Sequence, residues 1–310
     1  MDIVIIGSYI VALVMDTDRI PLKGETLMGR NFRQTFGGKG SNQAVQAARL
    51  GANVAFAGMI GNDSYGNDFL QLCSREKIDT THVKKHPVLP TASGFIICGG
   101  GHNIITIDIG ALNGVDEPYI DSVIEKCRKN SIILLQQEIP LKSALYAARK
   151  AHECGIKVIL NPAPAFNISH ENLSYVDIIT PNETEARVCL GLPPSDNTPD
   201  EEIAEQLLKL GCRNVVITLG DKGCLVAGQC TTTRVKPWKI DKAVDSTGAG
   251  DSFNAALAVA LSEGKSITEA ALFANAAAAL SSSCCFKSRQ SLSSRSTTTM
   301  TRQSAGNHSA

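Results

Sequence analysis

Short apolar runs alternate with longer segments of helical periodicity along most of this chain, and this alternation restricts the possible fold more than any other feature. The apolar runs lie at 3–6, 53–58, 131–136, 156–160, 177–180 and 214–218. The helical segments lie at 40–50, 64–76, 117–127, 141–153, 183–190, 200–210, 250–263 and 267–280. Strands and helices that alternate in this way form a mostly parallel sheet with helices on both faces. We therefore expect one doubly wound α/β domain over residues 1–280.

Two segments interrupt this rhythm, at about 9–35 and 90–109. The second contains Gly99–Gly101 between two short apolar runs, which is typical of a β-hairpin. We expect the two segments to form a small β-sheet that projects from the main sheet as a lid. The exposed edges of such a sheet often pair between subunits, so a homodimer through the lid is a further possibility.

Composition excludes several classes of partner. The 310 residues include 30 basic and 30 acidic side chains, so bulk charge gives no reason to expect nucleic acid or a membrane surface as a partner. The sequence contains no apolar run long enough for a spanning helix, and its start, Met1–Gly7, reads as a buried strand rather than a signal peptide. The cysteines lack metal-ligand spacing and fit a reducing compartment. We expect a cytoplasmic protein.

The C-terminal segment 281–310 differs from the rest. It contains 14 Ser or Thr residues, four basic residues and no acidic residue, with almost nothing apolar after Phe286. Such a segment cannot bury enough apolar surface to offset the entropy lost on ordering, so we expect it to be disordered.

The segment 245–251 (DSTGAGD) is the first candidate site. Its small residues allow a tight bend, and the apolar residues after it predict a buried helix. The bend therefore lies at a helix N-terminus, where unpaired backbone N–H groups and the helix dipole can hold a phosphate. Asp251 is then either a carboxylate beside an anion site or a surface residue favoured by the dipole.

A second glycine-rich helix start lies at 36–44 (FGGKGSNQA). Its glycines permit close backbone approach, and Lys39 and Asn42 provide donors for a hydroxylated ligand. The phosphate-binding P-loop pattern is absent from the sequence. A helix start of this kind is structural as often as it is functional.

Three further segments follow predicted strands. In 180–186 (TPNETEA), Asn182 and Glu185 form a helix capping box or hold the water shell of Mg²⁺. The turns at 218–223 and 136–138 come at the carboxyl ends of strands, where ligands gather in open α/β sheets, although each also fits an ordinary loop.

Taken together and in this order, these motifs resemble the ribokinase-like (PfkB) carbohydrate kinases. Segments 37–44 and 245–253 are similar to the two signatures of that family, and 21–26, 58–66, 161–165, 180–185 and 217–220 also match. The resemblance covers about residues 3–280 and is closest to the kinases of ribose. It implies phosphoryl transfer from MgATP to a sugar hydroxyl, with the sugar under the lid.

The resemblance also implies roles for individual residues. Asp251 would be the general base, and the N–H groups of Gly248, Ala249 and Gly250 would form an anion hole. The remaining assignments are Gly38, Lys39, Asn42 and Glu138 for the sugar, Asn182 and Glu185 for the Mg²⁺ shell and phosphate, Thr218, Gly220 and Asn275 for nucleotide, and Asp245 and Thr247 for a monovalent cation such as K⁺.

The chain departs from the family pattern at three places. Ile10 and Ala12 replace two polar residues that bind sugar hydroxyls in the kinases of ribose, and an apolar residue at position 10 resembles the deoxyribokinases. Segment 110–113 (GALN) differs at the end of the lid. The sequence from 281 replaces a loop that closes over adenine. A nucleoside kinase and a catalytically weak sugar-binding protein are therefore alternatives.

Overall fold

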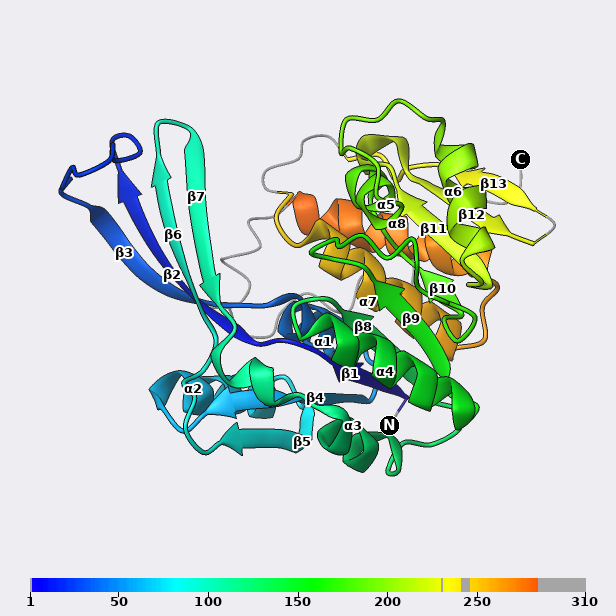
Figure 1. Cartoon of the computed structure of the whole chain (residues 1–310), viewed down its shortest axis with the longest axis horizontal. Helices are drawn as coiled ribbons and strands as arrows, with labels where there is room; N and C mark the ends of the chain where they lie inside the picture. The colour runs from blue at the N-terminus through cyan, green and yellow to red at the C-terminus, as the bar shows by residue number, and fades with distance from the viewer. Residues whose placement is uncertain (1, 230, 241–245, 284–310) are drawn as a thin grey trace, which may run out of the picture.

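The computed structural model describes residues 2–229, 231–240 and 246–283 and contains two β-sheets (Figure 1). Within these residues the central sheet has nine strands in the order β13-β12-β11-β10-β9-β8-β1-β4-β5. Its strands are β1 (Ile3–Ile6), β4 (Val54–Gly61), β5 (Asp79–His86), β8 (Ile132–Gln136), β9 (Lys157–Asn161), β10 (Ile178–Ile179), β11 (Asn214–Thr218), β12 (Cys224–Gly228) and β13 (Thr232–Val235).

The central sheet is parallel from β5 to β11, and only its last two pairings, β11 with β12 and β12 with β13, are antiparallel. Strand β1 is fully buried, with β4 on one side and β8 on the other. Successive side chains of a strand point to opposite faces, so Val4 and Ile6 join one core cluster while Ile3 and Ile5 join the other. A strand buried on both faces is apolar at every position, which explains the continuous apolar runs in the sequence.

Helices cover both faces, as the sequence predicts. One face packs against α3 (Glu117–Ile124), α4 (Leu141–Glu153), α5 (Glu183–Cys189) and α6 (Asp200–Lys209). The other packs against α1 (Lys39–Arg49), α2 (Ser64–Arg75), α7 (Ala249–Ser262) and α8 (Ile267–Ser282). Helix α7 is buried almost all round, because it lies between the sheet and α8. Its N-terminus is therefore held rigidly.

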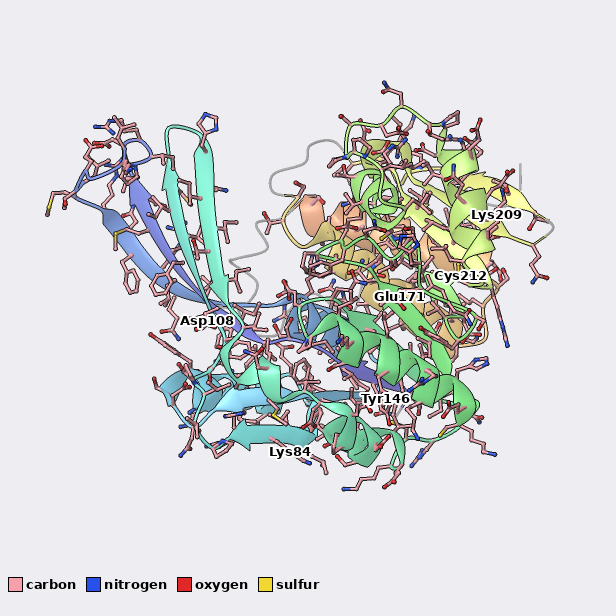
Figure 2. The ribbon with its side chains drawn as sticks, viewed as in Figure 1. Lys84, Asp108, Tyr146, Glu171, Lys209 and Cys212 are labelled. Atoms are coloured by element: carbon pink, nitrogen blue, oxygen red, sulfur yellow. The ribbon has the colours of Figure 1, made fainter. Side chains whose placement is uncertain are left out.

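The smaller sheet contains β3 (Arg30–Gly37), β2 (Ile10–Thr17), β6 (Ser93–Gly99) and β7 (His102–Asp108), in that order. It projects away from the helices and the central sheet in Figure 1. Every residue of the edge strand β7 is exposed, and Asp108, labelled in Figure 2, marks the point where β7 returns to the body. The lid expected from 9–35 and 90–109 is this sheet, and β3 extends it to Gly37, inside the glycine-rich segment 36–44.

The predicted elements agree with the observed ones to within a few residues. The main differences are strands that the apolar runs did not indicate, β5, β12 and β13, and the end of α8, which continues to Ser282 rather than stopping at 280. Residues 284–310, which include most of the C-terminal segment, lie outside the described residues. None of the described helices is both long and apolar enough to cross a membrane.

Candidate active site

Several site residues lie at or after the carboxyl ends of parallel strands of the central sheet. Ser8 follows β1, Glu138 follows β8, and Asn182 follows β10. Thr218 ends β11 and pairs with Asn182 in an isolated parallel bridge. This edge is where open α/β sheets bind ligands, because the loops there diverge and leave room between them.

The glycine-rich segment 36–44, called the first glycine motif here because it comes earlier in the chain, lets the N-terminus of α1 pack directly on the chain after β1. Gly38 has a φ of 90°, and a Cβ there would lie 2.8 Å from the Ile10 nitrogen. A Cβ on Gly40 would lie 2.6 Å from the Ser8 nitrogen. Only glycine tolerates both the conformation and the approach, so these two residues have a structural reason to be present.

The described part of segment 245–251, the second glycine motif along the chain, forms the N-terminus of α7. Gly248 is the residue before the helix and is left-handed, with φ 79°, while Ala249, Gly250 and Asp251 form the first turn. No described atom lies within 4 Å of a Cβ added to Gly250, so its backbone faces open space. The Ala249 nitrogen donates to the Ser246 carbonyl at 3.1 Å, which leaves the N–H groups of Gly248 and Gly250 as the donors of this turn that an anion could approach.

Asp251 is buried and is held by side chains of α1. Its Oδ2 accepts a hydrogen bond from Asn42 Nδ2 at 2.9 Å, and its Oδ1 accepts one from Gln43 Nε2 at 3.0 Å. The two motifs, separated by more than 200 residues in the sequence, thus meet through one carboxylate. The alternative of a surface aspartate is wrong, because only 7% of the residue is exposed.

A network of buried amides extends from Asp251 beneath the site. Gln43 Nε2 also lies 3.2 Å from Asn161 Oδ1, and Gln43 Oε1 accepts from Gln136 Nε2. Asn161 Nδ2 in turn donates to the Thr180 carbonyl at 3.0 Å. Because unpaired polar groups are costly in such a place, the network fixes the orientation of Gln43 and hence of the carboxylate.

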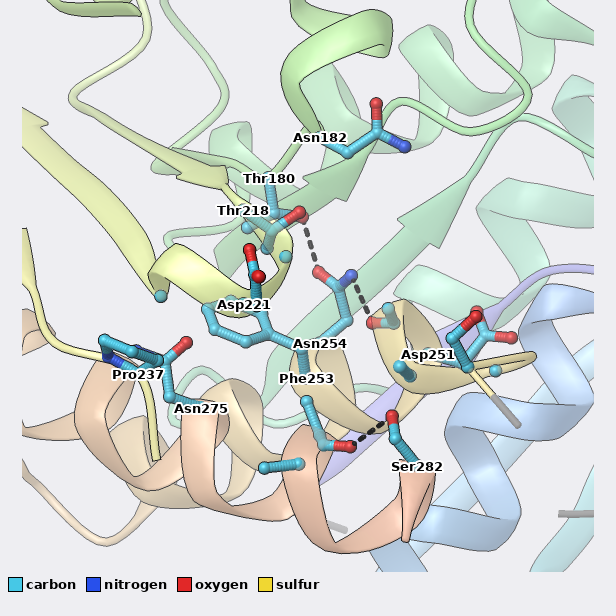
Figure 3. Close-up of a pocket in the computed structure, with 18 of the residues that line it drawn as sticks. Thr180, Asn182, Thr218, Asp221, Pro237, Asp251, Phe253, Asn254, Asn275 and Ser282 are labelled. Carbon is cyan, nitrogen blue, oxygen red and sulfur yellow. Dashed lines mark hydrogen bonds between the residues drawn. The ribbon is translucent and has the colours of Figure 1, made fainter. Parts of the chain in front are cut away.

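Asn254 connects the same helix to β10. Its Oδ1 accepts a hydrogen bond from Thr180 Oγ1, and its Nδ2 donates to the Gly250 carbonyl at 2.9 Å, as the dashed lines in Figure 3 show. The first turn of α7 is thereby held to the end of the central sheet.

The charges near Asp251 are coupled. Burial raises the pKa of Asp251, while Lys39 and the hydrogen bonds from Asn42 and Gln43 oppose that rise. Burial alone would lower the pKa of Lys39, but the carboxylates of Asp251, Glu138 and Glu185 outweigh burial and raise it. Lys39 is therefore a firmly charged ammonium beside a carboxylate whose proton affinity is increased.

Glu138 is tied to the first motif. Its Oε2 accepts hydrogen bonds from Ser8 Oγ and from the Lys39 backbone nitrogen, the latter at 2.6 Å. Burial raises the pKa of Glu138 and these two donors oppose the rise. The structure therefore brings Gly38, Lys39, Asn42, Glu138 and Asp251 together, as the sequence predicts.

A cavity of about 1000 Å³ opens beside these residues, with Asp251, Asn254 and Thr180 on its wall (Figure 3). Among the candidate residues, Lys39, Asn182, Glu185, Thr218, Gly220, Gly248, Ala249, Gly250, Asp251 and Asn275 line it. Asn42, Gly38 and Glu138 are not among its lining residues in the described part of the chain. The volume is ample for a nucleotide.

Asn182 and Glu185 form the expected capping box of α5. Asn182 Oδ1 accepts from the Glu185 nitrogen at 2.8 Å, and Glu185 Oε2 accepts from the Asn182 nitrogen at 2.9 Å. Both residues also line the cavity, and burial raises the pKa of Glu185. The cap uses Oε2 and leaves Glu185 Oε1 for another ligand. No cluster of three or more His, Cys, Asp or Glu side chains with metal-binding geometry occurs among the described residues.

The nucleotide candidates lie at the far end of the cavity. Gly220, with φ 58°, begins a short 3-10 turn after β11. Asn275 of α8 lines the cavity, but its Nδ2 donates to the carbonyl of Lys236 at 3.1 Å. Thr247 lies just before the α7 turn, and Asp245 lies outside the described residues.

The departures from the family pattern have local explanations. Ile10 is 4% exposed and joins the core cluster that contains Ala92 and Leu112. In 110–113, Leu112 is fully buried, and Asn113 instead donates through Nδ2 to the Gly110 carbonyl, which closes a 3-10 turn.

Several site residues were not expected from the sequence. They share amide or hydroxyl side chains whose partners are distant in the chain: Gln43, Asn161, Thr180 and Asn254. Two of them carried a sequence signal, because Gln43 follows Asn42 and Asn254 lies one turn after Asp251. Asn161 ends β9 and Thr180 follows β10. Both lie in segments that match the family pattern, but nothing in their neighbourhood marks them as polar partners of α1 and α7.

Comparison with known proteins agrees with this geometry. The profile of the pfkB family carbohydrate kinases matches residues 1–285. The ribokinase of Haemophilus influenzae is 40% identical over 278 residues, covering 89% of this chain and 90% of that protein. The deoxyribokinase of Salmonella typhi is 35% identical over 259 residues, covering 82% of this chain and 83% of that protein.

The fold also matches solved structures. The structure of Arabidopsis thaliana ribokinase complexed with ribose and ATP superposes with a TM-score of 0.82 at 30% sequence identity. The match covers 91% of this chain and 93% of the Arabidopsis chain.

Proposed function

Because the chain belongs to the pfkB family of carbohydrate kinases, we propose that it transfers the γ-phosphoryl group of ATP to the 5-hydroxyl of D-ribose or of a closely related pentose such as deoxyribose. The observation that carries the proposal is the buried carboxylate of Asp251. It lies in the first turn of α7, next to the backbone N–H groups of Gly248 and Gly250, and beside Lys39.

In the proposed mechanism Asp251 accepts the proton of the attacking hydroxyl as the oxygen bonds to phosphorus and the bond to the leaving ADP oxygen breaks. The N–H groups of Gly248, Ala249 and Gly250 bind the negative charge on the transferred group, and Lys39 offsets part of it. The raised pKa of Asp251 favours a base, because proton transfer is most efficient when the pKa of the base lies nearer the working pH.

The sugar is proposed to bind between the first glycine motif and the lid. Gly38 allows its backbone to approach the ligand, and Lys39, Asn42 and Glu138 provide polar groups for the hydroxyls. Asn42 Oδ1 supports this assignment, because it is a buried acceptor with no hydrogen-bond partner among the described residues. A buried acceptor without a partner costs free energy until a ligand donates to it.

Magnesium fits the Asn182 and Glu185 end of the cavity. Mg²⁺ prefers oxygen ligands and keeps several waters, so one carboxylate and one amide suffice to hold a hydrated ion. When bound with ATP, Mg²⁺ would neutralise charge on the phosphates. Thr218, Gly220 and Asn275 would lie along the nucleotide, and Thr247 together with Asp245 would hold a monovalent cation such as K⁺.

The identity of the sugar depends on the lid. Ile10 and Ala12 offer no hydrogen bond to a hydroxyl, which favours a substrate that lacks one, such as 2-deoxyribose. A nucleoside would need a deeper apolar pocket, and Tyr9 does not supply one. Its ring is buried and stacks on Phe69 with a centroid distance of 4.2 Å.

A substrate panel tests the proposal. ADP release with MgATP and K⁺ is measured with ribose, 2-deoxyribose, other sugars and nucleosides, for the wild type and for Ala12→Asp. We expect pentose-dependent turnover, and expect Ala12→Asp, which restores a polar side chain at a position that binds sugar hydroxyls in the family, to raise kcat/KM for both ribose and deoxyribose. Turnover only with nucleosides would support a nucleoside kinase. Saturable sugar binding by calorimetry without turnover would show a weak sugar-binding protein instead.

We further propose a cytoplasmic homodimer formed through the lid. Large apolar side chains are exposed on three of its strands, namely Phe32, Phe95, Ile104, Ile105 and Ile107. Phe95 and Ile104 lie on one face of the lid, and Ile105 and Ile107 lie on the other, so both faces carry exposed apolar side chains that a second subunit could cover. Sedimentation of the wild type and of a variant with Ile105→Glu is expected to show a dimer and a monomer respectively, and a monomeric wild type would contradict this assembly.

A further inference from the structure

The only tryptophan of the chain lies at the rim of the cavity. Trp238 lines it together with Pro237, Ala278 and Ala279, and 53% of its surface is exposed. Within the described residues no other aromatic ring stacks on the indole and no cation lies over it. An aromatic side chain this large is usually buried or in contact with a partner, so its position on a cavity wall indicates a ligand.

The backbone that carries Trp238 is held firmly. Strand β13 pairs with β12 up to Val235, opposite Cys224. The chain then passes over Gly223, where an added Cβ would lie 2.2 Å from the Val235 oxygen and 2.8 Å from the Pro237 nitrogen. The indole is therefore presented from a fixed segment and loses little conformational entropy on binding a ligand.

Asn275 contributes to the same anchor. Its Nδ2 donates to the Lys236 carbonyl at 3.1 Å and lies 3.5 Å from the Val235 carbonyl, and Figure 3 shows its side chain beside Pro237. The buried Cys224 thiol also has the Asn275 side chain as a hydrogen-bonding neighbour. The side-chain amide of Asn275 is thus already hydrogen-bonded within the protein in the absence of a nucleotide.

The neighbouring part of α8 offers little hydrogen bonding. Ala278 and Ala279 present methyl groups, and Ser282 donates its hydroxyl to the Ala278 carbonyl at 3.0 Å. A cavity wall that combines an indole ring with the methyl groups of two alanines suits the face of a flat ring better than its polar edge. Adenine stacked against an aromatic ring is such a ligand.

We propose that Trp238 is the residue that stacks on the nucleotide base, and that Asn275 is a positioning residue that holds the Trp238 segment instead of binding the base. This inference rests on the proposed nucleotide role of the cavity and adds the means by which the base is held. Stacking involves the face of the base and not its hydrogen-bonding edge. The affinities for adenine and guanine nucleotides should therefore depend on Trp238 to the same extent.

Fluorescence tests the inference directly, because all tryptophan emission of the chain comes from Trp238. The full chain is titrated with MgATP, MgGTP and inorganic tripolyphosphate, and Kd values are measured in parallel by calorimetry. We expect both nucleotides to quench the emission and tripolyphosphate to bind without quenching. Trp238→Ala should raise the Kd for ATP by about fivefold to a hundredfold, and by the same factor for GTP.

Three variants complete the test. Trp238→Phe keeps a ring and should restore most of the affinity, and Phe166→Ala, which removes an exposed aromatic residue outside the cavity, should leave the Kd unchanged. Asn275→Ala should weaken ATP binding in the wild type but add nothing in the Trp238→Ala background. Additive effects would show that Asn275 binds the base itself.

Two results would overturn the inference in different ways. In the first, calorimetry shows that ATP binds, the emission of the wild type does not change, and Trp238→Ala has the same Kd as the wild type. This result would refute stacking while leaving the cavity as a nucleotide site. No ATP binding at all would refute the nucleotide assignment and the stacking together.

Discussion

Replacing Gln43 with methionine tests whether the buried amides set the proton affinity of Asp251. Gln43 is fully buried and donates to Asp251 Oδ1 at 3.0 Å. Methionine has a similar volume and no donor, so the change removes the hydrogen bond without creating a large cavity. Asp251 would retain Asn42 as its only side-chain donor.

The size of the effect follows from the charge on the acceptor. A hydrogen bond to a charged group contributes about 1.5 to 3 kcal/mol, and one pKa unit corresponds to about 1.36 kcal/mol. Losing it disfavours the ionised form, so the pKa of Asp251, already raised by burial, should rise by roughly one to two further units. Because a general base must be unprotonated, activity declines as the pH falls through this pKa, and the acidic limb should move to higher pH.

The assay is kcat against pH with saturating sugar and MgATP, for the wild type, Gln43→Met and Gln46→Met. Gln46 lies on the same helix and is not bonded to Asp251, so its variant controls for the loss of an amide from α1. An active Gln43→Met enzyme whose acidic limb coincides with that of the wild type would refute the reasoning. Thermal unfolding is measured alongside, because Gln136 also loses its acceptor.

Three further predictions concern activity and stability. Gly250→Ala should unfold at the same or a higher temperature, because an added Cβ meets no atom within 4 Å and alanine is the better helix former by about 1 kcal/mol. The variant should nevertheless turn over at least about tenfold more slowly, because the methyl group lies in the anion site, and wild-type kinetics would contradict this. Arg187→Met should lower the free energy of unfolding by about 3 kcal/mol or more in chemical denaturation, because the guanidinium donates to the carbonyls of Glu183, Asp196 and Thr198 and pairs with Asp200. The control Lys222→Met removes one partner of an exposed ion pair and should cost less than about 1 kcal/mol. Equal costs would refute the distinction between buried and exposed pairs. Asp251→Asn should be at least as stable to unfolding as the wild type at pH 7, because a carboxyl whose pKa is raised in the folded state costs stability when it is ionised. The gain in stability should vanish below the pKa of an unfolded aspartate, where the carboxyl is protonated in both states. A variant that is less stable than the wild type at pH 7 would contradict the burial effect.

The elements that the sequence predicted well are those that are buried on both faces. Strands such as β1 and β8 are continuous apolar runs, because helices cover both sides of a parallel sheet. The strands that were not expected are β5 and β13, at the two edges of the central sheet, and β12, which pairs with β13. β5 reads DTTHVKKH, and its lysines suit an exposed edge, so its pairing with β4 is determined by tertiary contacts rather than by its own pattern.

The candidate site shows the same division. Gly38, Lys39, Gly248 and Asp251 were found because each lies in a compact motif at a helix start. Asn161, Thr180 and Asn254 were not, because each acts through a partner at least 70 residues away or in another strand. Asn275 was expected at the nucleotide, and only the structure reveals that its amide is bonded to the Lys236 carbonyl.

The central claim is that one carboxylate at the start of α7 removes the proton from the attacking sugar hydroxyl. Rapid-quench measurement of a single turnover with bound MgATP and pentose, in the wild type and in Asp251→Ala, tests it most directly. The account predicts that the variant still binds both substrates by calorimetry, while phosphoryl transfer slows by roughly 10² to 10⁴-fold. Transfer at close to the wild-type rate in the variant would contradict it.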